Sequence, residues 1–242
     1  MTALLEARNL FKRFGGLAAV KHLSLHVDPG EALGLIGPNG AGKTTIFNLI
    51  MDELKPDSGE ILFRDVDITR KPTHERVKQG IVRTYQVPRP FADMTVAANI
   101  RVGMMPDDLG SMMRHGPDLA REREIGLSVG FGDRELAMYP GELSMGDLRR
   151  LELARNLAAD PKLLLLDEVF AGLTVAEIGQ ISDLLVAHKK QGLTYIIVSH
   201  DLRSLAPLVD RVIAISFGET IAEGPFSEVI ENEAVQKAYL GN

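Results

Sequence analysis

The sequence predicts an α/β fold in which a mainly parallel sheet carries a phosphate-binding loop and a helical segment is inserted into the frame. Three observations support this prediction. Residues Gly37 to Thr45 match a glycine-rich phosphate loop between an expected strand and an expected helix. The apolar run Leu163–Leu166 is typical of a parallel strand buried on both faces. Between about residues 88 and 159 the spacing of apolar residues is mostly helical.

Composition narrows the class of protein. The chain of 242 residues, 45% hydrophobic and 25% charged, suits a globular protein of one α/β domain or two small ones. Its net charge of −6 argues against a nucleic-acid partner, because such proteins usually carry a basic face. The absence of cysteine excludes disulfides and thiolate metal sites. No apolar run approaches the ~20 residues that cross a bilayer, so work at a membrane would need a partner or a surface.

The loop predicts a defined chemistry. It fits the pattern G-x-x-x-x-G-K-[ST] and consists of Gly37, Pro38, Asn39, Gly40, Ala41, Gly42, Lys43, Thr44 and Thr45. Its glycines let successive N–H groups point into one concavity, and a helix starting at Thr44 adds its positive dipole end. Lys43 is then expected to reach the β- and γ-phosphates, and Thr44 to bind Mg²⁺. Ala32–Ile36 reads as the buried strand that must precede such a loop.

The rest of the chain before residue 88 is expected to be mainly strands. Leu23, Leu25 and Val27 alternate with polar residues, which is the period of a half-buried strand. Clusters of Pro, Asp, Ser and Gly mark the turns. In chain order we expect strands over Leu4–Val27, a turn at Asp28–Glu31, a strand over Glu60–Phe63, a polar turn at Asp65–Asp67, a short helix over Thr73–Gln79 that ends at Gly80, and a strand over Ile81–Tyr85.

Helices are expected next, and then a return to the α/β frame. Thr95 can cap a helix, and Pro161 stops a later one. Four of the nine methionines lie between residues 103 and 117, mostly in the stretch 104–113, where we expect a flexible surface loop. The expected elements are helices from Thr95 through Ile100, near Leu119–Leu127, from Ser144 to Asp160 and over Val175–Lys190, strands at Leu163–Asp167, Thr194–Ser199 and Arg211–Ser216, and short helices in Pro225–Leu240.

Four polar side chains stand at the ends of expected strands, where α/β folds place ligands. Asp167 is expected to act on Mg²⁺, largely through water, and Glu168 on an attacking water. Gln86 could touch both the metal shell and that water, although a surface glutamine is the simpler interpretation. His200, as a neutral imidazole, could bind a γ-phosphate, although a histidine at a strand end is more often structural.

The helix that begins at Ser144 has two interpretations. Ser144 is a good N-cap and Asp147 can complete a capping box, which fully explains the serine. Alternatively, Ser144, the Gly146 backbone and the helix N-terminus bind a phosphate. Because the helix belongs to the inserted segment, that phosphate would come from a nucleotide on another copy.

Five motifs stand in a fixed order: the phosphate loop, Gln86, Leu143–Gly146, the strand ending in Asp167-Glu168, and Ser199–Asp201. In this order and spacing the whole chain resembles the ATPase subunit of an ABC transporter. It looks most similar to the ATPases of branched-chain amino-acid importers. The stretches that carry this closer likeness are Arg13–Leu17, Gly80–Gln86, Arg149–Arg155 and Ala238–Gly241. ATPases of amide or urea uptake and of lipopolysaccharide export share several of them.

The resemblance implies a fold and a site. The chain would be one ABC ATPase domain over residues 1–242, with a RecA-like core and an antiparallel β subdomain in 1–87 and 160–242 and a helical subdomain in about 88–159. ATP and Mg²⁺ would bind at the loop, and Phe14 would stack on adenine, although by sequence alone it is more often a core residue. The catalytic residues would be Glu168, His200 and Gln86, and the metal residues Thr44, Gln86 and Asp167. The residues that contact the nucleotide of a second cassette would be Ser144, Met145, Gly146 and Asp147.

The resemblance also implies an assembly. Two cassettes, identical or paralogous, would form a head-to-tail dimer with ATP and drive two membrane subunits between inward and outward states. Arg89 and Phe91 would contact a membrane subunit, and a periplasmic binding protein would act indirectly. The chain would sit peripherally at the cytoplasmic face of the inner membrane. An ABC ATPase of DNA repair or translation is the alternative, but such proteins usually carry two cassettes or a long coiled coil.

Five positions depart from the family pattern. Met145 and Asp147 replace the third and fifth residues of the usual Leu-Ser-Gly-Gly-Gln signature. Val169 stands where Pro usually follows the catalytic Glu, and Thr174-Val175 replaces an Asp or Asn followed by Pro. These departures leave open a cassette that binds ATP without hydrolysing it, and they bear on coupling between two sites more than on ATP binding.

Overall fold

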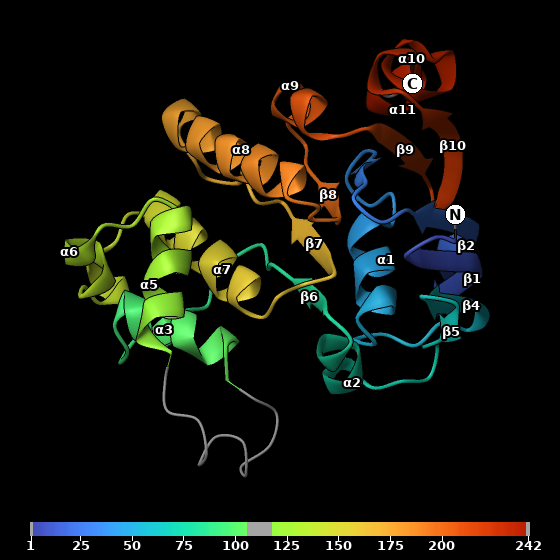
Figure 1. Cartoon of the computed structure of the whole chain (residues 1–242). Coiled ribbons are helices and arrows are strands. Elements are labelled where there is room, and N and C mark those ends of the chain that lie inside the picture. The colour runs from blue at the N-terminus through green and yellow to red at the C-terminus, as the bar shows by residue number, and fades with distance from the viewer. Residues whose placement is uncertain (1, 106–117, 241–242) are drawn as a thin grey trace.

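A six-stranded sheet forms the centre of the molecule (Figure 1). The computed structural model describes residues 2–105 and 118–240. The strand order is β10-β9-β3-β8-β7-β6, and every neighbouring pair is parallel except β10 with β9. The strands are β3 (Ala32–Ile36), β6 (Ile81–Arg83), β7 (Leu163–Asp167), β8 (Tyr195–Val198), β9 (Arg211–Ser216) and β10 (Glu219–Gly224).

The parallel strands are buried on both faces, which explains why they read as continuous apolar runs. In β7, Leu163 and Leu165 join the core on one face, while Leu164 and Leu166 join the core on the other. Each buried leucine contributes about 1.5–3 kcal/mol relative to an exposed one. Helix α1 (Lys43–Ile50) packs on the first face, and α8 (Val175–Lys190) on the second.

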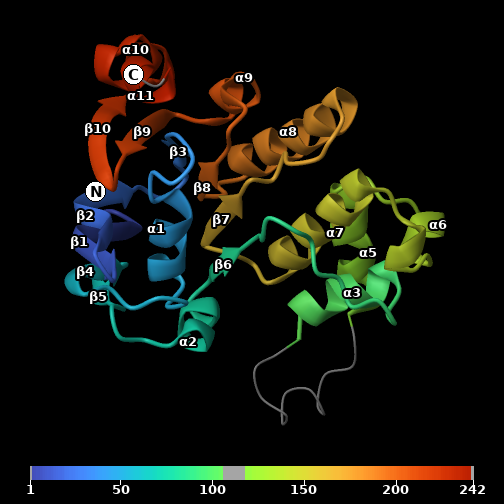
Figure 2. The ribbon, with the colours of Figure 1, turned by 180° about the vertical axis from the view of Figure 1, so that it is seen from behind.

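A second, antiparallel sheet lies beyond α1, so that this helix is enclosed between two sheets (Figures 1 and 2). Its strands, in the order β2-β1-β4-β5, are β1 (Leu5–Phe14), β2 (Leu17–Val27), β4 (Ser58–Phe63) and β5 (Val66–Asp67). The polar turn predicted at Asp65–Asp67 is therefore partly wrong. The chain turns at Arg64 and Asp65, both with positive φ, and residues 66–67 pair with β4.

The helices between β6 and β7 have a core of their own, separate from the cores on the sheet. They lie on the side of the central sheet away from the antiparallel sheet (Figure 2). They are α3 (Val96–Gly103), α5 (Leu119–Ser128), α6 (Asp133–Leu136), a 3₁₀ turn (Pro140–Glu142) and α7 (Met145–Ala158). Thr95 caps α3 as predicted, since its side chain accepts from the Ala98 N–H. The methionine-rich loop predicted near 104–113 falls largely on residues 106–117, outside the described residues.

The remaining helices are short. Strand β10, which the sequence did not predict, leads into the last two helices of the chain, α10 and α11. They are α2 (Thr73–Lys78), α9 (Leu202–Leu205), a 3₁₀ turn (Ala206–Leu208), α10 (Phe226–Glu231) and α11 (Glu233–Leu240). Among the described residues, none of the helices combines the length and apolar character needed to cross a bilayer.

Candidate nucleotide site

The loop turns between β3 and α1 in a path that only glycine permits at two points. Gly42 has φ 111°, and a Cβ there would lie 2.5 Å from the carbonyl oxygen of Ala19. At Gly37 a Cβ would lie 2.2 Å from the carbonyl oxygen of Ile215. Contacts this short exclude any side chain, so both glycines are required for the loop to approach the strands beside it.

The predicted site residues gather around one cavity of about 410 Å³. They come from the loop and from the ends of β1, β6, β7 and β8. The lining is Phe14, Leu17, Ala19, Asn39, Gly40, Ala41, Gly42, Lys43, Thr44, Thr45, Gln86, Asp167, Glu168 and His200. Sequence reasoning missed Leu17 and Ala19. Gly37 and Pro38 do not line the cavity, and their carbonyl oxygens accept hydrogen bonds from Lys43 Nζ at 2.6 and 3.0 Å.

Lys43 is the cation of this cavity. Its side chain is buried, and burial lowers the pKa of its ammonium, while the charges of Glu168 and Asp167 act in the opposite direction. The two loop carbonyls replace the water that the ammonium has lost. A phosphate entering the loop would offer the same donors a charged acceptor, which makes a stronger hydrogen bond than a carbonyl.

Glu168 and His200 face each other across the cavity. Glu168 has φ 51°, in the left-handed region, a strain of about 1–3 kcal/mol that is typical of functional sites. Its Oε1 lies 3.0 Å from His200 Nε2. Burial raises the pKa of the Glu168 carboxyl, against the charge of Lys43. Burial, with the charge of Lys43, lowers the pKa of His200, so its imidazole is neutral at pH 7.

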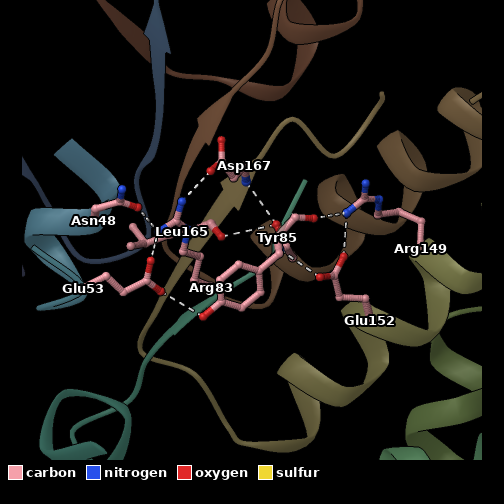
Figure 3. A network of polar contacts seen from close by, with 9 residues as sticks. Asn48, Glu53, Arg83, Tyr85, Arg149, Glu152, Leu165 and Asp167 are labelled. Atoms are coloured by element: carbon pink, nitrogen blue, oxygen red, sulfur yellow. Dashed lines mark hydrogen bonds and ion pairs between the residues drawn. The ribbon is translucent and has the colours of Figure 1, made fainter. Parts of the chain in front are cut away.

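Asp167 is held by neighbours that sequence reasoning did not name (Figure 3). Its buried carboxylate accepts a hydrogen bond from Arg83 Nη2 at 2.6 Å, and its N–H donates to Thr84 Oγ1 at 3.0 Å. Arg83 also donates to Asn48 and Glu53 on and just after α1. An arginine inside an otherwise apolar strand was the available signal, because a buried arginine requires anionic partners.

The oxygen donors fit a magnesium ion. Mg²⁺ takes hard oxygen ligands and is usually held by one or two protein groups together with waters and phosphate oxygens. The Thr44 hydroxyl, the Gln86 amide and the Asp167 carboxylate all line the cavity. Because Arg83 engages Oδ2 of Asp167, the other carboxylate oxygen is the one that can face a hydrated ion.

The segment after β6 is tied to α7, and this corrects the predicted strand. The sequence predicted a strand over Ile81–Tyr85, whereas β6 ends at Arg83. The reason is that the Tyr85 backbone has partners on α7: its N–H donates to Glu152 and its carbonyl accepts from Arg149, at 2.9 and 2.6 Å (Figure 3). Arg149 also donates to the Gln86 carbonyl at 2.8 Å. The buried ion pair of Arg149 and Glu152 therefore links the Tyr85–Gln86 backbone to α7, the helix that Ser144 caps.

The Ser144 segment lies apart from the cavity of its own chain, since none of its residues line it. Ser144 caps α7 as predicted, and Asp147 completes the capping box. Asp147 also pairs with Arg150, and hydrogen bonds from Arg150 and Ser144 lower its pKa despite partial burial. The Gly146 N–H, predicted to bind a phosphate, donates to Glu177 Oε1 at 3.1 Å.

Known proteins resemble this chain over its whole length. A family described as "ABC transporter" matches residues 20–171, and one described as "Branched-chain amino acid ATP-binding cassette transporter" matches residues 219–242. The probable branched-chain amino acid transport ATP-binding protein LivG of Archaeoglobus fulgidus is 36% identical, over 98% of this chain and 95% of the relative. The lipopolysaccharide export system ATP-binding protein LptB of Escherichia coli is 37% identical, over 99% and 98%.

Solved structures agree with the fold. The ADP conformation of MJ1267, an ATP-binding cassette of an ABC transporter, superposes with a TM-score of 0.88 at 30% identity, covering 100% of both chains. The dimeric structure of MJ0796, a bacterial ABC transporter cassette, superposes with a TM-score of 0.77 at 25% identity, covering 92% of this chain and 98% of that one. The matching family, the full-length relatives and the fold lead to one conclusion: this chain belongs to the ABC transporter family, as an ATP-binding subunit that hydrolyses ATP to power transport.

Proposed function

We propose that this cassette powers an importer of branched-chain or related amino acids. The observation that carries the ATPase part is the single cavity shared by the phosphate loop, Asp167, Glu168 and His200. The importer part rests on the LivG relative and on the C-terminal family match over residues 219–242. LptB is as similar in sequence, so an exporter of lipopolysaccharide is the second candidate, with amide or urea uptake beside it.

The residues divide the reaction between them. The loop amides and Lys43 bind the β- and γ-phosphates, and Phe14, 46% exposed at the cavity edge, stacks on adenine. A magnesium ion held near Thr44, Gln86 and Asp167 would neutralise developing phosphate charge. Glu168 accepts a proton from the attacking water as that water bonds to the γ-phosphorus and the bond to the leaving ADP oxygen breaks. His200, released from Glu168, donates a hydrogen bond to the γ-phosphate.

The assembly we propose is one cassette per chain and two cassettes per transporter. The helical subdomain, about residues 88–159, offers Ser144, Met145 and Gly146 to the nucleotide of the partner cassette. Glu177 then has to leave the Gly146 N–H, because one donor cannot serve both acceptors. Two membrane subunits contact the exposed Val87, Arg89 and Phe91, and a periplasmic protein delivers substrate. This arrangement puts the chain at the cytoplasmic face of the inner membrane.

On acidification, ATP hydrolysis should be lost at a higher pH than it would be with a glutamate of ordinary pKa as the base. Glu168 must be a carboxylate to accept a proton, and burial raises its pKa, so its protonated form appears early on acidification. Burial and the charge of Lys43 lower the pKa of His200, so its protonation is delayed on acidification. The pH profile of kcat/KM for ATP measures this, since it reports the free enzyme. A profile that stays flat down to the range of an exposed carboxyl would contradict the assignment.

Transport in vesicles tests the substrate. The chain is purified with its own membrane subunits, reconstituted with the binding protein, and supplied with ATP and labelled leucine, isoleucine or valine. ATP-dependent accumulation of these amino acids supports the proposal. Stimulation of hydrolysis by urea or amides, or extraction of lipopolysaccharide instead, would assign the cassette to one of the other systems.

A further inference from the structure

The C-terminal helix α11 reaches the start of the phosphate loop through one side chain. The hydroxyl oxygen of Tyr239 accepts a hydrogen bond from the Gly37 N–H at 2.7 Å, across 202 residues of sequence. Tyr239 is half-buried, and together with Val235 it packs α11 against the core on the outer face of the sheet. The position i to i+4 of these two residues puts both side chains on one face of the helix.

Gly37 depends on this contact. It lies one residue beyond Ile36, the last residue of β3 to pair with β9, so the sheet supplies no acceptor for its N–H. A Cβ at residue 37 would lie 2.2 Å from the Ile215 carbonyl oxygen, so the chain passes close to β9 at this point. A buried N–H without an acceptor loses its hydrogen bonds to water and gains none in return, so the phenol oxygen satisfies a backbone group that would otherwise destabilise the loop.

The same residue is also anchored on its other side. The Gly37 carbonyl accepts from Lys43 Nζ at 2.6 Å. When a phosphate takes over Lys43, this second anchor is released, and the hydrogen bond that Gly37 donates to Tyr239 still holds residue 37. Burial raises the pKa of the Tyr239 hydroxyl, and the negative charge of Glu168 adds to this shift.

We propose that Tyr239 is a positioning residue of the nucleotide site: it fixes the entry of the phosphate loop, so that α11 is a working part of the site rather than a terminal helix packed beside it. This inference rests on the proposed nucleotide site. It gives Tyr239, which lies in a stretch that the importer-like pattern singles out, a physical role in the half of the site that this chain supplies.

The test is nucleotide affinity in the full-length Tyr239→Phe variant. The substitution removes the acceptor and keeps the ring that packs α11. Losing one hydrogen bond to a buried donor should raise the Kd for both ATP and ADP about tenfold, because both carry the β-phosphate that the loop holds. In the assembled transporter KM for ATP should rise with kcat nearly unchanged, as for a group that binds ground state and transition state equally. Selective ¹⁵N labelling should show faster exchange of the Gly37 amide proton.

Tyr195→Phe is the matched control. It also removes a hydroxyl that bonds to the backbone. The Tyr195 hydroxyl donates to the Leu208 carbonyl, at the opposite end of the strands from the loop. The control should lose thermal stability and keep its ATP affinity and its Gly37 exchange rate. An unchanged Kd in Tyr239→Phe, or an equal loss in both variants, would overturn the proposal, the latter by assigning the effect to general destabilisation. Failure of the wild-type chain to bind ATP would instead overturn the nucleotide site itself.

Discussion

Glu168→Gln is expected to lower ATP turnover by at least about a hundredfold while ATP affinity stays within a few-fold of wild type. A positioned base contributes about 10²–10⁴ to the rate of a proton transfer, and an amide cannot accept the proton. The amide keeps the size and one oxygen of the carboxyl, so the close contact with His200 Nε2 can survive. Binding should hold or improve, since the variant removes a negative charge from beside the phosphates.

The same variant should accumulate as an ATP-bound dimer. If ATP is held between the loop of one chain and the Ser144 segment of another, a chain that binds without hydrolysing stays in that state. Light scattering with and without ATP and Mg²⁺ measures the dimer, and phosphate release measures turnover. Glu228→Gln, a change at an exposed glutamate of α10 that does not line the cavity, is the control. Wild-type turnover in Glu168→Gln would remove this residue from its role as base.

Much of the fold could be predicted because its signals are local. The strands of the central sheet are buried on both faces and read as uninterrupted apolar runs, as at Leu163–Leu166. Helix ends follow from caps next to them in sequence, as at Thr95 and Ser144. Strand β10 escaped prediction because its burial is only partial and its pairing with β9 determines it. Local pattern carries no information about such a partner.

The part of the site that was missed is the part made by long-range contacts. Lys43, Asp167 and Glu168 stand in motifs whose spacing alone predicts their chemistry. Arg83 donates a hydrogen bond to Asp167, and Tyr239 accepts one from Gly37, 84 and 202 residues away. A single sequence shows only that an arginine sits in an apolar strand and a tyrosine near the end of a helix. Which backbone or carboxyl group each one meets depends on the completed fold.

Lys43→Ala is expected to weaken ATP binding by about a hundredfold or more. The variant loses two or more hydrogen bonds from a charged donor to phosphate oxygens, each worth about 1.5–3 kcal/mol. It should nevertheless fold. Burial lowers the pKa of Lys43, so the folded chain disfavours the charged ammonium. Removing this charge therefore removes an unfavourable desolvation free energy, which offsets the hydrogen bonds that the Gly37 and Pro38 carbonyls lose.

Titration calorimetry with ATP and Mg²⁺, beside a thermal melt without nucleotide, separates these two effects. Lys190→Ala, at the exposed end of α8, removes an equal charge away from the cavity and should bind as wild type does. A sharp fall in the melting temperature of Lys43→Ala would attribute its weak binding to misfolding. The titration would then be repeated with Lys43→Met, which keeps much of the buried aliphatic stem. Undiminished affinity in a folded variant would refute the loop assignment. Among the described residues that line the cavity, Lys43 is the one with a positive charge, because His200 is neutral at pH 7.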